Sequence, residues 1–217
     1  MIMGHSISDT DAFGAAIGIY CAARVLGKKA QIVLDQVTSS LRPLKEGFTT
    51  EKGYPPDMFV SSERALELTD YNTLVMVVDV NRPSHTECPG LLKRTDSIVV
   101  FDHHRQSSEV ISNPVLSYIE PYASSTCEMV AEVLQYFTEN IKLAPHEADC
   151  IYAGILIDTS NFMTKTGVRT FEAAAYLKRC GAEVTRVRKM LRNDMDAYKA
   201  RAEVVRHAEV YLSLIHI

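Results

Sequence analysis

The stretch "SIVVFDHHR", residues 97–105, joins an apolar run to an acid, two histidines and an arginine. A short apolar run rich in β-branched residues is typical of a strand buried on both faces, as in a parallel sheet. Polar side chains beside a core are costly to bury unless they bind something. The stretch therefore predicts a buried strand with a binding site at its carboxyl end.

Similar apolar runs alternate with helical patterns along the chain. "QIVLD" (31–35) and "TLVMVVDV" (73–80) predict further buried parallel strands. Alternation of this kind implies right-handed crossovers, and so an α/β fold with a mainly parallel sheet covered on both faces. Ligands of such sheets bind outside the carboxyl ends of the strands. The predicted helices cover 12–27, 61–70, 124–140, 145–159, 168–181, 184–194 and a segment from about 195 onward.

Local signals add detail to this outline. Gly27 is placed to cap the end of the first helix, and Ser125 with Glu128 three residues later fits a capping box. The Gly- and Pro-bearing segment 42–57 is predicted to be a long irregular loop. "MIMG" is short for a first buried strand, and the apolar end "HAEVYLSLIHI" has no helix stop signal. We therefore expect the chain to be a fragment, whose tail either packs against a missing segment or is not native.

The composition limits the class of protein. The chain has 217 residues, 47% of them hydrophobic, and a net charge of −4. This balance disfavours a binder of duplex nucleic acid, but it leaves open a small anionic ligand held by a few local cations. The five cysteines are scattered, as is typical of buried thiols in a reducing compartment. The apolar runs are too short for a membrane span, so we expect a soluble, cytoplasmic chain.

Side chains able to bind metal follow the predicted strands or end a predicted helix. Taken singly they have ordinary explanations, since Asp9 or Asp11 could cap the helix that starts near Ala12. Asp158, however, lies in the apolar stretch "AGILIDTSNF", where an unpaired carboxylate is costly. Because these side chains all map to the carboxyl ends of strands or to a helix end, we predict that they converge on metal. The candidate ligands are His5, Asp9, Asp11, Asp79, His103 and Asp158.

Four carboxylates and two imidazoles are too many ligands for one ion that must also hold a substrate. Two divalent ions could share them, and oxygen-rich ligation suits Mn²⁺, with Mg²⁺ or Co²⁺ as substitutes. A pair of such ions favours displacement at phosphorus, because a bound dication lowers the pKa of water. In this interpretation Asp102 orients a histidine, and His104 and Arg105 face the phosphate.

The set of motifs resembles the DHH phosphoesterase family, named for its Asp-His-His triplet, over essentially the whole chain. The resemblance implies a Rossmann-like α/β/α DHH domain, here 1–193. A linker helix and truncated tail (194–217) would then lead to a missing DHH-associated domain. It also implies that the six candidate ligands hold two Mn²⁺ ions and that His104 contacts the scissile phosphate.

Four stretches resemble one subgroup, the GdpP-type cyclic-di-AMP phosphodiesterases: "IMGHSISDTDAFGAAIGIY", "VVDVNRPSHTE", "YASSTCEMV" and "TGVRTFEAAAYL". The resemblance implies hydrolysis of cyclic di-AMP to pApA and a membrane-anchored parent protein. Many members of the subgroup have histidine where this chain has Asn81. We predict substrate contacts from Asn81, Arg169, Ser124 and Ser125. Capping alone would also explain the two serines.

Other functions stay open. An oligoribonuclease or pAp phosphatase of the same family would use the same ligands, and so would a family II inorganic pyrophosphatase. The sequence contains no Gly-Gly-Gly-His element, which the resemblance assigns to the DHH-associated domain. A metal-binding or dimerising module without catalytic activity is therefore the non-enzyme alternative, and a homodimer is left open.

Overall fold

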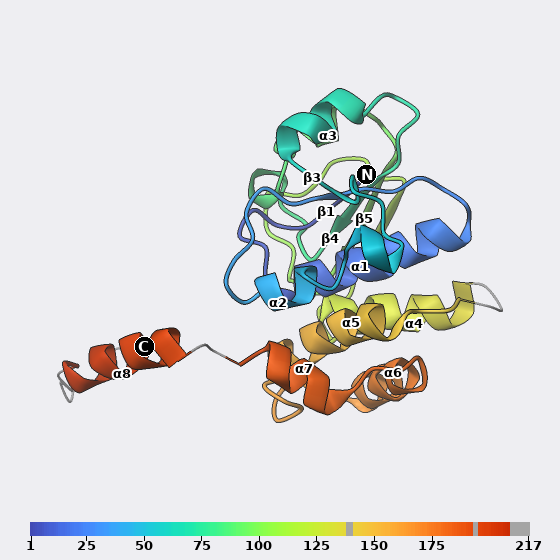
Figure 1. The fold of residues 1–217 in the computed structure, drawn as a ribbon. Helices are drawn as coiled ribbons and strands as arrows, with labels where there is room; N and C mark the ends of the chain where they lie inside the picture. Colours follow the sequence, from blue (N-terminus) through green and yellow to red (C-terminus); the bar gives the residue numbers. More distant parts are fainter. Residues whose placement is uncertain (138–140, 193–194, 209–217) are drawn as a thin grey trace.

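A computed structural model of the chain describes residues 1–137, 141–192 and 195–208. It contains a six-stranded parallel sheet in the order β3-β2-β1-β4-β5-β6 (Figure 1). This is the Rossmann strand order, in which the direction of strand addition reverses between β1 and β4. The strands are β1 (Ile2–Met3), β2 (Ile32–Val33), β3 (Phe59–Val60), β4 (Val75–Val78), β5 (Ile98–Asp102) and β6 (Leu116–Ile119).

Each face of the sheet is buried in its own hydrophobic core. Along β5, Ile98 and Val100 pack into one core, while Val99 and Phe101 pack into the other. Successive side chains of a strand point to opposite faces, so a run that is apolar at every position must be covered on both. The opening stretch is therefore a doubly buried strand, as predicted.

Helices cover the two faces unequally. On one face α1 and α4 contact the sheet, α5 packs on both of them, and α6 and α7 lie outside α5 (Figure 1). On the other face, α3 and short 3₁₀ turns close the smaller core. The helices are α1 (Thr10–Val25), α2 (Arg42–Lys45), α3 (Ser62–Leu68), α4 (Thr126–Phe137), α5 (Pro145–Asp158), α6 (Val168–Arg179), α7 (Val184–Met190) and α8 (Met195–Arg206). The 3₁₀ turns are η1 (Thr50–Lys52), η2 (Pro83–His85) and η3 (Pro89–Lys93).

The predicted α/β sandwich is confirmed, with local differences. The first helix starts two residues earlier than predicted, because Asp9 caps it. Gly27 does follow its end with a positive φ of 66°. The segment 42–57 is not an irregular loop: it holds α2 and η1, and Phe48 packs edge-on against Tyr54 at 4.8 Å between ring centroids.

The apolar patterns in the sequence did not reveal every strand. β1, only two residues long, is central in the sheet, whereas β3 and the half-exposed edge strand β6 carry no buried run to reveal them. Figure 1 shows α8 apart from the body of the molecule. The division at 193/194 stays a prediction, and the apolar tail 209–217 lies outside the described residues. Among the described helices, none has both the length and the apolarity of a membrane span.

Candidate metal and phosphate site

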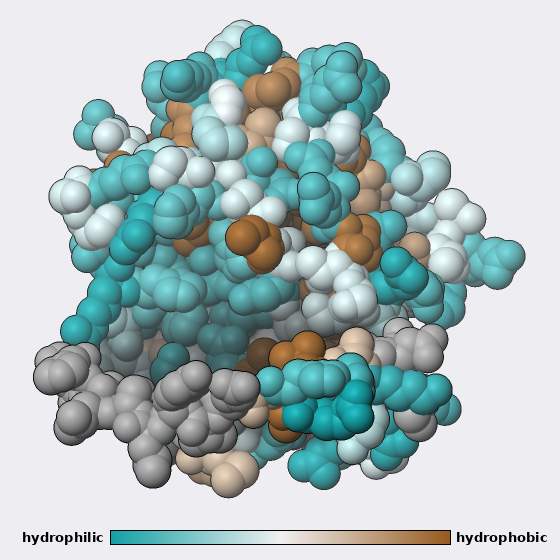
Figure 2. Space-filling view, turned by 90° about the vertical axis from the view of Figure 1, so that its left-hand side faces the viewer, coloured by the Kyte–Doolittle hydropathy of each residue, from teal (hydrophilic) through white to brown (hydrophobic). Residues whose placement is uncertain are grey.

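The carboxyl ends of β1, β4 and β5 open into a cavity of about 670 Å³. This is where the strand order reverses, the usual place for a ligand in an open α/β sheet. Figure 2 views the molecule from this side and shows a hollow lined by hydrophilic residues. The cavity is large enough for a nucleotide, since ligand pockets commonly measure about 300–1,000 Å³.

The first group of possible metal ligands is His5, Asp9 and Asp79, with ligand atoms within 4.8 Å of one another. His5 Nε2 lies 3.5 Å from Asp9 Oδ2 and 3.6 Å from Asp79 Oδ2. The other oxygen of Asp9 accepts hydrogen bonds of 3.0 Å from the backbone N–H groups of Asp11 and Ala12. Asp9 therefore caps α1 and still presents one oxygen to the cluster, so the two explanations of this residue are compatible.

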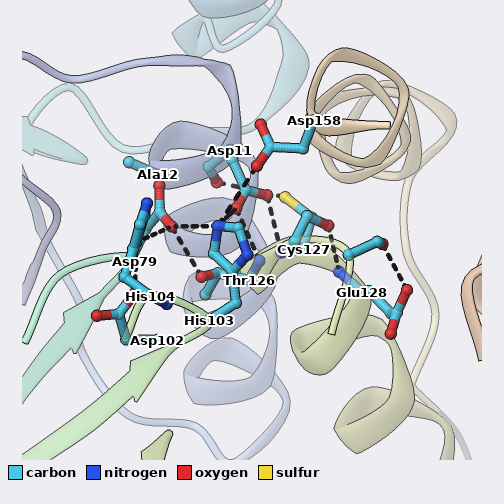
Figure 3. Close-up of polar contacts among 12 residues, drawn as sticks. Asp11, Ala12, Asp79, Asp102, His103, His104, Thr126, Cys127, Glu128 and Asp158 are labelled. Atoms are coloured by element: carbon cyan, nitrogen blue, oxygen red, sulfur yellow. Dashed lines mark hydrogen bonds and ion pairs between the residues drawn. The ribbon is translucent and has the colours of Figure 1, made fainter. Parts of the chain in front are cut away.

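The second group is Asp11, His103 and Asp158. His103 Nε2 points between three carboxylates, 3.4 Å from Asp158, 3.5 Å from Asp79 and 3.9 Å from Asp11 (Figure 3). This nitrogen is buried and has no hydrogen-bond partner. A buried polar atom without a partner is costly, and coordination to a cation would satisfy it. The donor set thus fits a divalent metal ion.

Asp79 connects the two groups. Its Oδ2 faces His5 and its Oδ1 faces His103. The residue follows β4 with a φ of 61°, in the left-handed region that few residues other than glycine adopt. This turn of the backbone lets one carboxylate serve both groups, as a bridging ligand would.

The start of α4 holds these carboxylates in place. The backbone N–H groups of Thr126 and Cys127 donate to the two oxygens of Asp11, at 2.7 and 2.9 Å. The Thr126 hydroxyl donates to Asp79 Oδ1 at 2.9 Å (Figure 3). Sequence reasoning missed both residues, because within "SSTCEMV" it assigned a binding role only to the two serines. A helix N-terminus attracts carboxylates, and that signal could have suggested the contact.

The electrostatics of the cluster favour added positive charge. Burial, with the charge of Asp11, raises the pKa of Asp79 well above its usual range, and the same two causes raise that of Asp158 to about 7. Burial opposes the charged form of His5, but its two carboxylate contacts outweigh this effect and raise its pKa to about 10. Burial lowers the pKa of His103, which suits a neutral imidazole ligand.

His104 lies on the wall of the cavity and forms a third group of possible ligands with Asp79 and His103, since its Nδ1 is 3.6 Å from Asp79 Oδ1. Its Nδ1 is 2.8 Å from Asp102 Oδ1, and this contact raises its pKa to about 9 despite burial. Asn81 Nδ2 donates to the other oxygen of Asp102 at 2.5 Å. The histidine that Asp102 orients is therefore His104, and the buried Asn81 supports Asp102. Arg105 is exposed and also lines the cavity.

The structure does not bring the remaining predicted contacts to the cavity lining. The Ser124 hydroxyl donates to Glu128 Oε2 at 2.5 Å, and Ser125 Oγ accepts the backbone N–H of Glu128 at 3.0 Å. Only the serine half of the predicted capping box forms. Arg169 makes a two-pronged ion pair with Glu132, with N–O distances of 2.6 and 2.7 Å. Substrate contact by these three residues stays a prediction.

Comparisons with known proteins find relatives along the whole chain. The cyclic-di-AMP phosphodiesterase GdpP of Bacillus subtilis is 40% identical over 221 residues, which cover 100% of this chain and 33% of that protein. The cyclic-di-AMP phosphodiesterase PdeA of Listeria monocytogenes is 35% identical over 97% of this chain and 32% of its own length. The chain thus spans about a third of the length of these curated relatives.

The fold also has a solved counterpart. An exopolyphosphatase-related protein from Bacteroides fragilis superposes with a TM-score of 0.81 at 17% identity, over 97% of this chain and 61% of that one. At this identity the match speaks for the fold alone. The model of the DHH family N-terminal domain matches residues 1–155. On this match and on the strand-end cluster of acids and histidines, the chain belongs to the DHH family.

Proposed function

We propose that this chain carries a phosphodiesterase site that uses two Mn²⁺ ions to hydrolyse cyclic di-AMP to pApA. The observation that supports it best is that Nε2 of His103 lies buried among three carboxylates without a hydrogen-bond partner. Asp79, one of these three, also belongs to the first group, with His5 and Asp9. The names of the relatives supply the substrate class. Because the chain spans about a third of the length of each of these relatives, the activity of the whole protein is also a proposal.

In this proposal one ion would be held by the group of His5, Asp9 and Asp79, and the other by the group of Asp11, His103 and Asp158. Asp79, whose Oδ1 also faces His103, would serve both groups. When bound, the two cations would offset the carboxylate charge, lower the pKa of water and bind the scissile phosphate. Oxygen-rich ligation with two imidazoles favours Mn²⁺ and admits Mg²⁺ or Co²⁺. The ligands are His5, Asp9, Asp79, Asp11, His103 and Asp158.

The residues beside the cluster then act on the phosphate. The contact with Asp102 raises the pKa of His104 and so favours a protonated ring, which can donate a charge-assisted hydrogen bond to a phosphate oxygen. Asp102 fixes the ring through Nδ1, which leaves Nε2 for the substrate. Arg105 adds a second cation on the same wall. A homodimer and a membrane-anchored parent remain predictions, which sedimentation and cell fractionation of the parent would test.

The metal arm of the test measures Mn²⁺ binding by calorimetry. We expect about two ions per chain, and at most one in Asp79→Ala, because that substitution removes an oxygen from each group. Asp96→Ala removes an exposed acid outside the cavity and should bind as the unaltered chain does. A stoichiometry of one in the unaltered chain would defeat the two-ion proposal.

The substrate arm compares turnover of cyclic di-AMP, pApA, pAp and pyrophosphate in Mn²⁺, on this chain and on one extended past Ile217. We expect a preference for cyclic di-AMP, stronger in the extended protein. Faster turnover of pAp or pApA would assign the chain to the oligoribonuclease and pAp phosphatase branch. Dominant hydrolysis of pyrophosphate would contradict both assignments.

A further inference from the structure

The cavity has a cationic wall that the proposed chemistry does not use. Arg82 and His85 line it, on the turn that directly follows Asp79, and both side chains are exposed. Within the described part of the chain, Arg82 makes no ion pair. An arginine beside an acidic cluster would ordinarily pair with it, so an unpaired guanidinium facing the same cavity is available to an anion.

The turn that carries these two residues is fixed on several sides. The N–H and hydroxyl of Ser84 donate to the two oxygens of Glu109, both at 2.9 Å. The N–H of Ser6 donates to the carbonyl of His85 at 2.8 Å, which ties the turn to the loop after β1. Pro83 limits the backbone further. A cation on a rigid turn loses less entropy when it binds a ligand.

Glu109 is close enough to Arg82 and His85 to interact with their charges. Its two oxygens accept hydrogen bonds from Ser84, and within the described residues it forms no ion pair with Arg82. The acids of the metal groups line the same cavity, and the turn approaches them at His85, whose carbonyl accepts the N–H of Ser6, next to His5. The cavity thus offers anionic groups two sets of side chains: His104 with the proposed metal ions, and Arg82 with His85.

We propose that Arg82 and His85 form a second phosphate subsite, which holds the phosphate of a dinucleotide that is not being cleaved. This inference rests on the proposed function, because the first phosphate must lie at the metal groups. The ligand class is a molecule with two phosphoryl groups separated by a sugar, and a cavity of about 670 Å³ has room for both.

The binding arm uses a hydrolysis-resistant probe, the bis-phosphorothioate analogue of cyclic di-AMP, in calorimetry with Mn²⁺. Arg82→Gln should weaken binding about tenfold, the lower end for a charge-assisted hydrogen bond, because the site is open to solvent. His85→Gln should cause a smaller loss. Arg94→Gln removes an exposed arginine outside the cavity and should change nothing. Unchanged affinity in Arg82→Gln would overturn the subsite.

The kinetic arm uses bis(p-nitrophenyl) phosphate, which has a single phosphodiester. Its kcat/KM should be the same in Arg82→Gln as in the unaltered chain. An equal loss on both probes would place Arg82 at the scissile phosphate and overturn the proposal. If Arg82-dependent binding is found but cyclic di-AMP is not hydrolysed, the proposed function fails while the subsite stands.

Discussion

Replacing Thr126 with valine tests whether the start of α4 controls the metal site. Valine matches threonine in shape, so the substitution leaves no cavity and removes one hydrogen bond, the 2.9 Å bond to Asp79 Oδ1. Thr126 is fully buried, so water cannot replace the lost donor. Hydrogen bonds to charged groups contribute about 1.5–3 kcal/mol. We expect a loss of about 2 kcal/mol in the free energy of unfolding, and a Tm lower by about 4–8 °C in EDTA.

The effect on metal binding should be larger than the effect on the fold. Asp79 is the shared carboxylate, and its pKa is already raised by burial. Without the Thr126 hydroxyl, the Asp79 carboxylate is less well oriented and binds a proton more readily. Mn²⁺ must then displace that proton, so its affinity falls. Loss of a residue that orients a metal ligand typically lowers metal affinity about 10–100-fold. Calorimetric titration with Mn²⁺ measures this directly.

Two other variants separate orientation from simple destabilisation. Thr69→Val removes another buried hydroxyl, which donates to the carbonyl of Ala65 at 2.7 Å. It should cost about 1 kcal/mol of stability and leave Mn²⁺ affinity unchanged. Thr126→Ser keeps the hydroxyl and should keep most of the affinity. Unaltered Mn²⁺ binding in Thr126→Val would refute the role assigned to this contact.

Two further predictions concern the histidine pair and one buried acid. His103→Ala should lose one of two bound Mn²⁺ ions. His104→Ala should keep both ions and lower kcat about a hundredfold, the lower range for the loss of one hydrogen bond to the reacting phosphate. The reverse pattern in the titrations would exchange their roles. Glu147 is buried and forms an ion pair with Arg24. Burial alone would raise the pKa of this acid, but the contact with Arg24 outweighs it and lowers the pKa below the usual 4.5. Its ionised form therefore stabilises the fold above pH 4.5, and this contribution disappears as the pH falls through the lowered pKa. Glu147→Gln should cost about 2 kcal/mol at pH 7 in urea unfolding, and less at pH 4. Glu67→Gln, in an exposed pair, should cost little at either pH, and a pH-independent loss for Glu147→Gln would contradict the assignment.

The sequence predicted the site better than it predicted its surroundings. Ligand side chains such as His103 stand next to apolar runs, so strand ends could be located and their convergence inferred. Thr126 escaped because its backbone N–H group has no sequence signature and its hydroxyl resembles any helix cap. The substrate contact of Arg169 stays a prediction, but its ion pair was not foreseen from its place after Asp158 in the chain. Its ion-pair partner Glu132 belongs to another helix, and only the packing of α6 on α4 brings the two together.

The same reasoning explains the errors in the fold. The two-residue strand β1 lies between β2 and β4, and its position depends on those neighbours more than on its own length. The segment 42–57 looked irregular because its Gly and Pro residues interrupt any periodic pattern. Its aromatic residue Phe48 is nevertheless packed between Phe13 and Tyr54, a tertiary contact that no local signal contains.

The backbone of Asp79 has a consequence for how this protein would respond to selection. The residue combines a left-handed conformation, which costs an ordinary residue about 1–2 kcal/mol, with a carboxylate buried among other acids. Asp79→Gly would relieve both penalties. A library selected only for heat resistance should therefore enrich glycine or asparagine at this position, and the enriched variants should lose Mn²⁺ binding. Such a result would show that function at this strand end is maintained against stability, as in other strained sites.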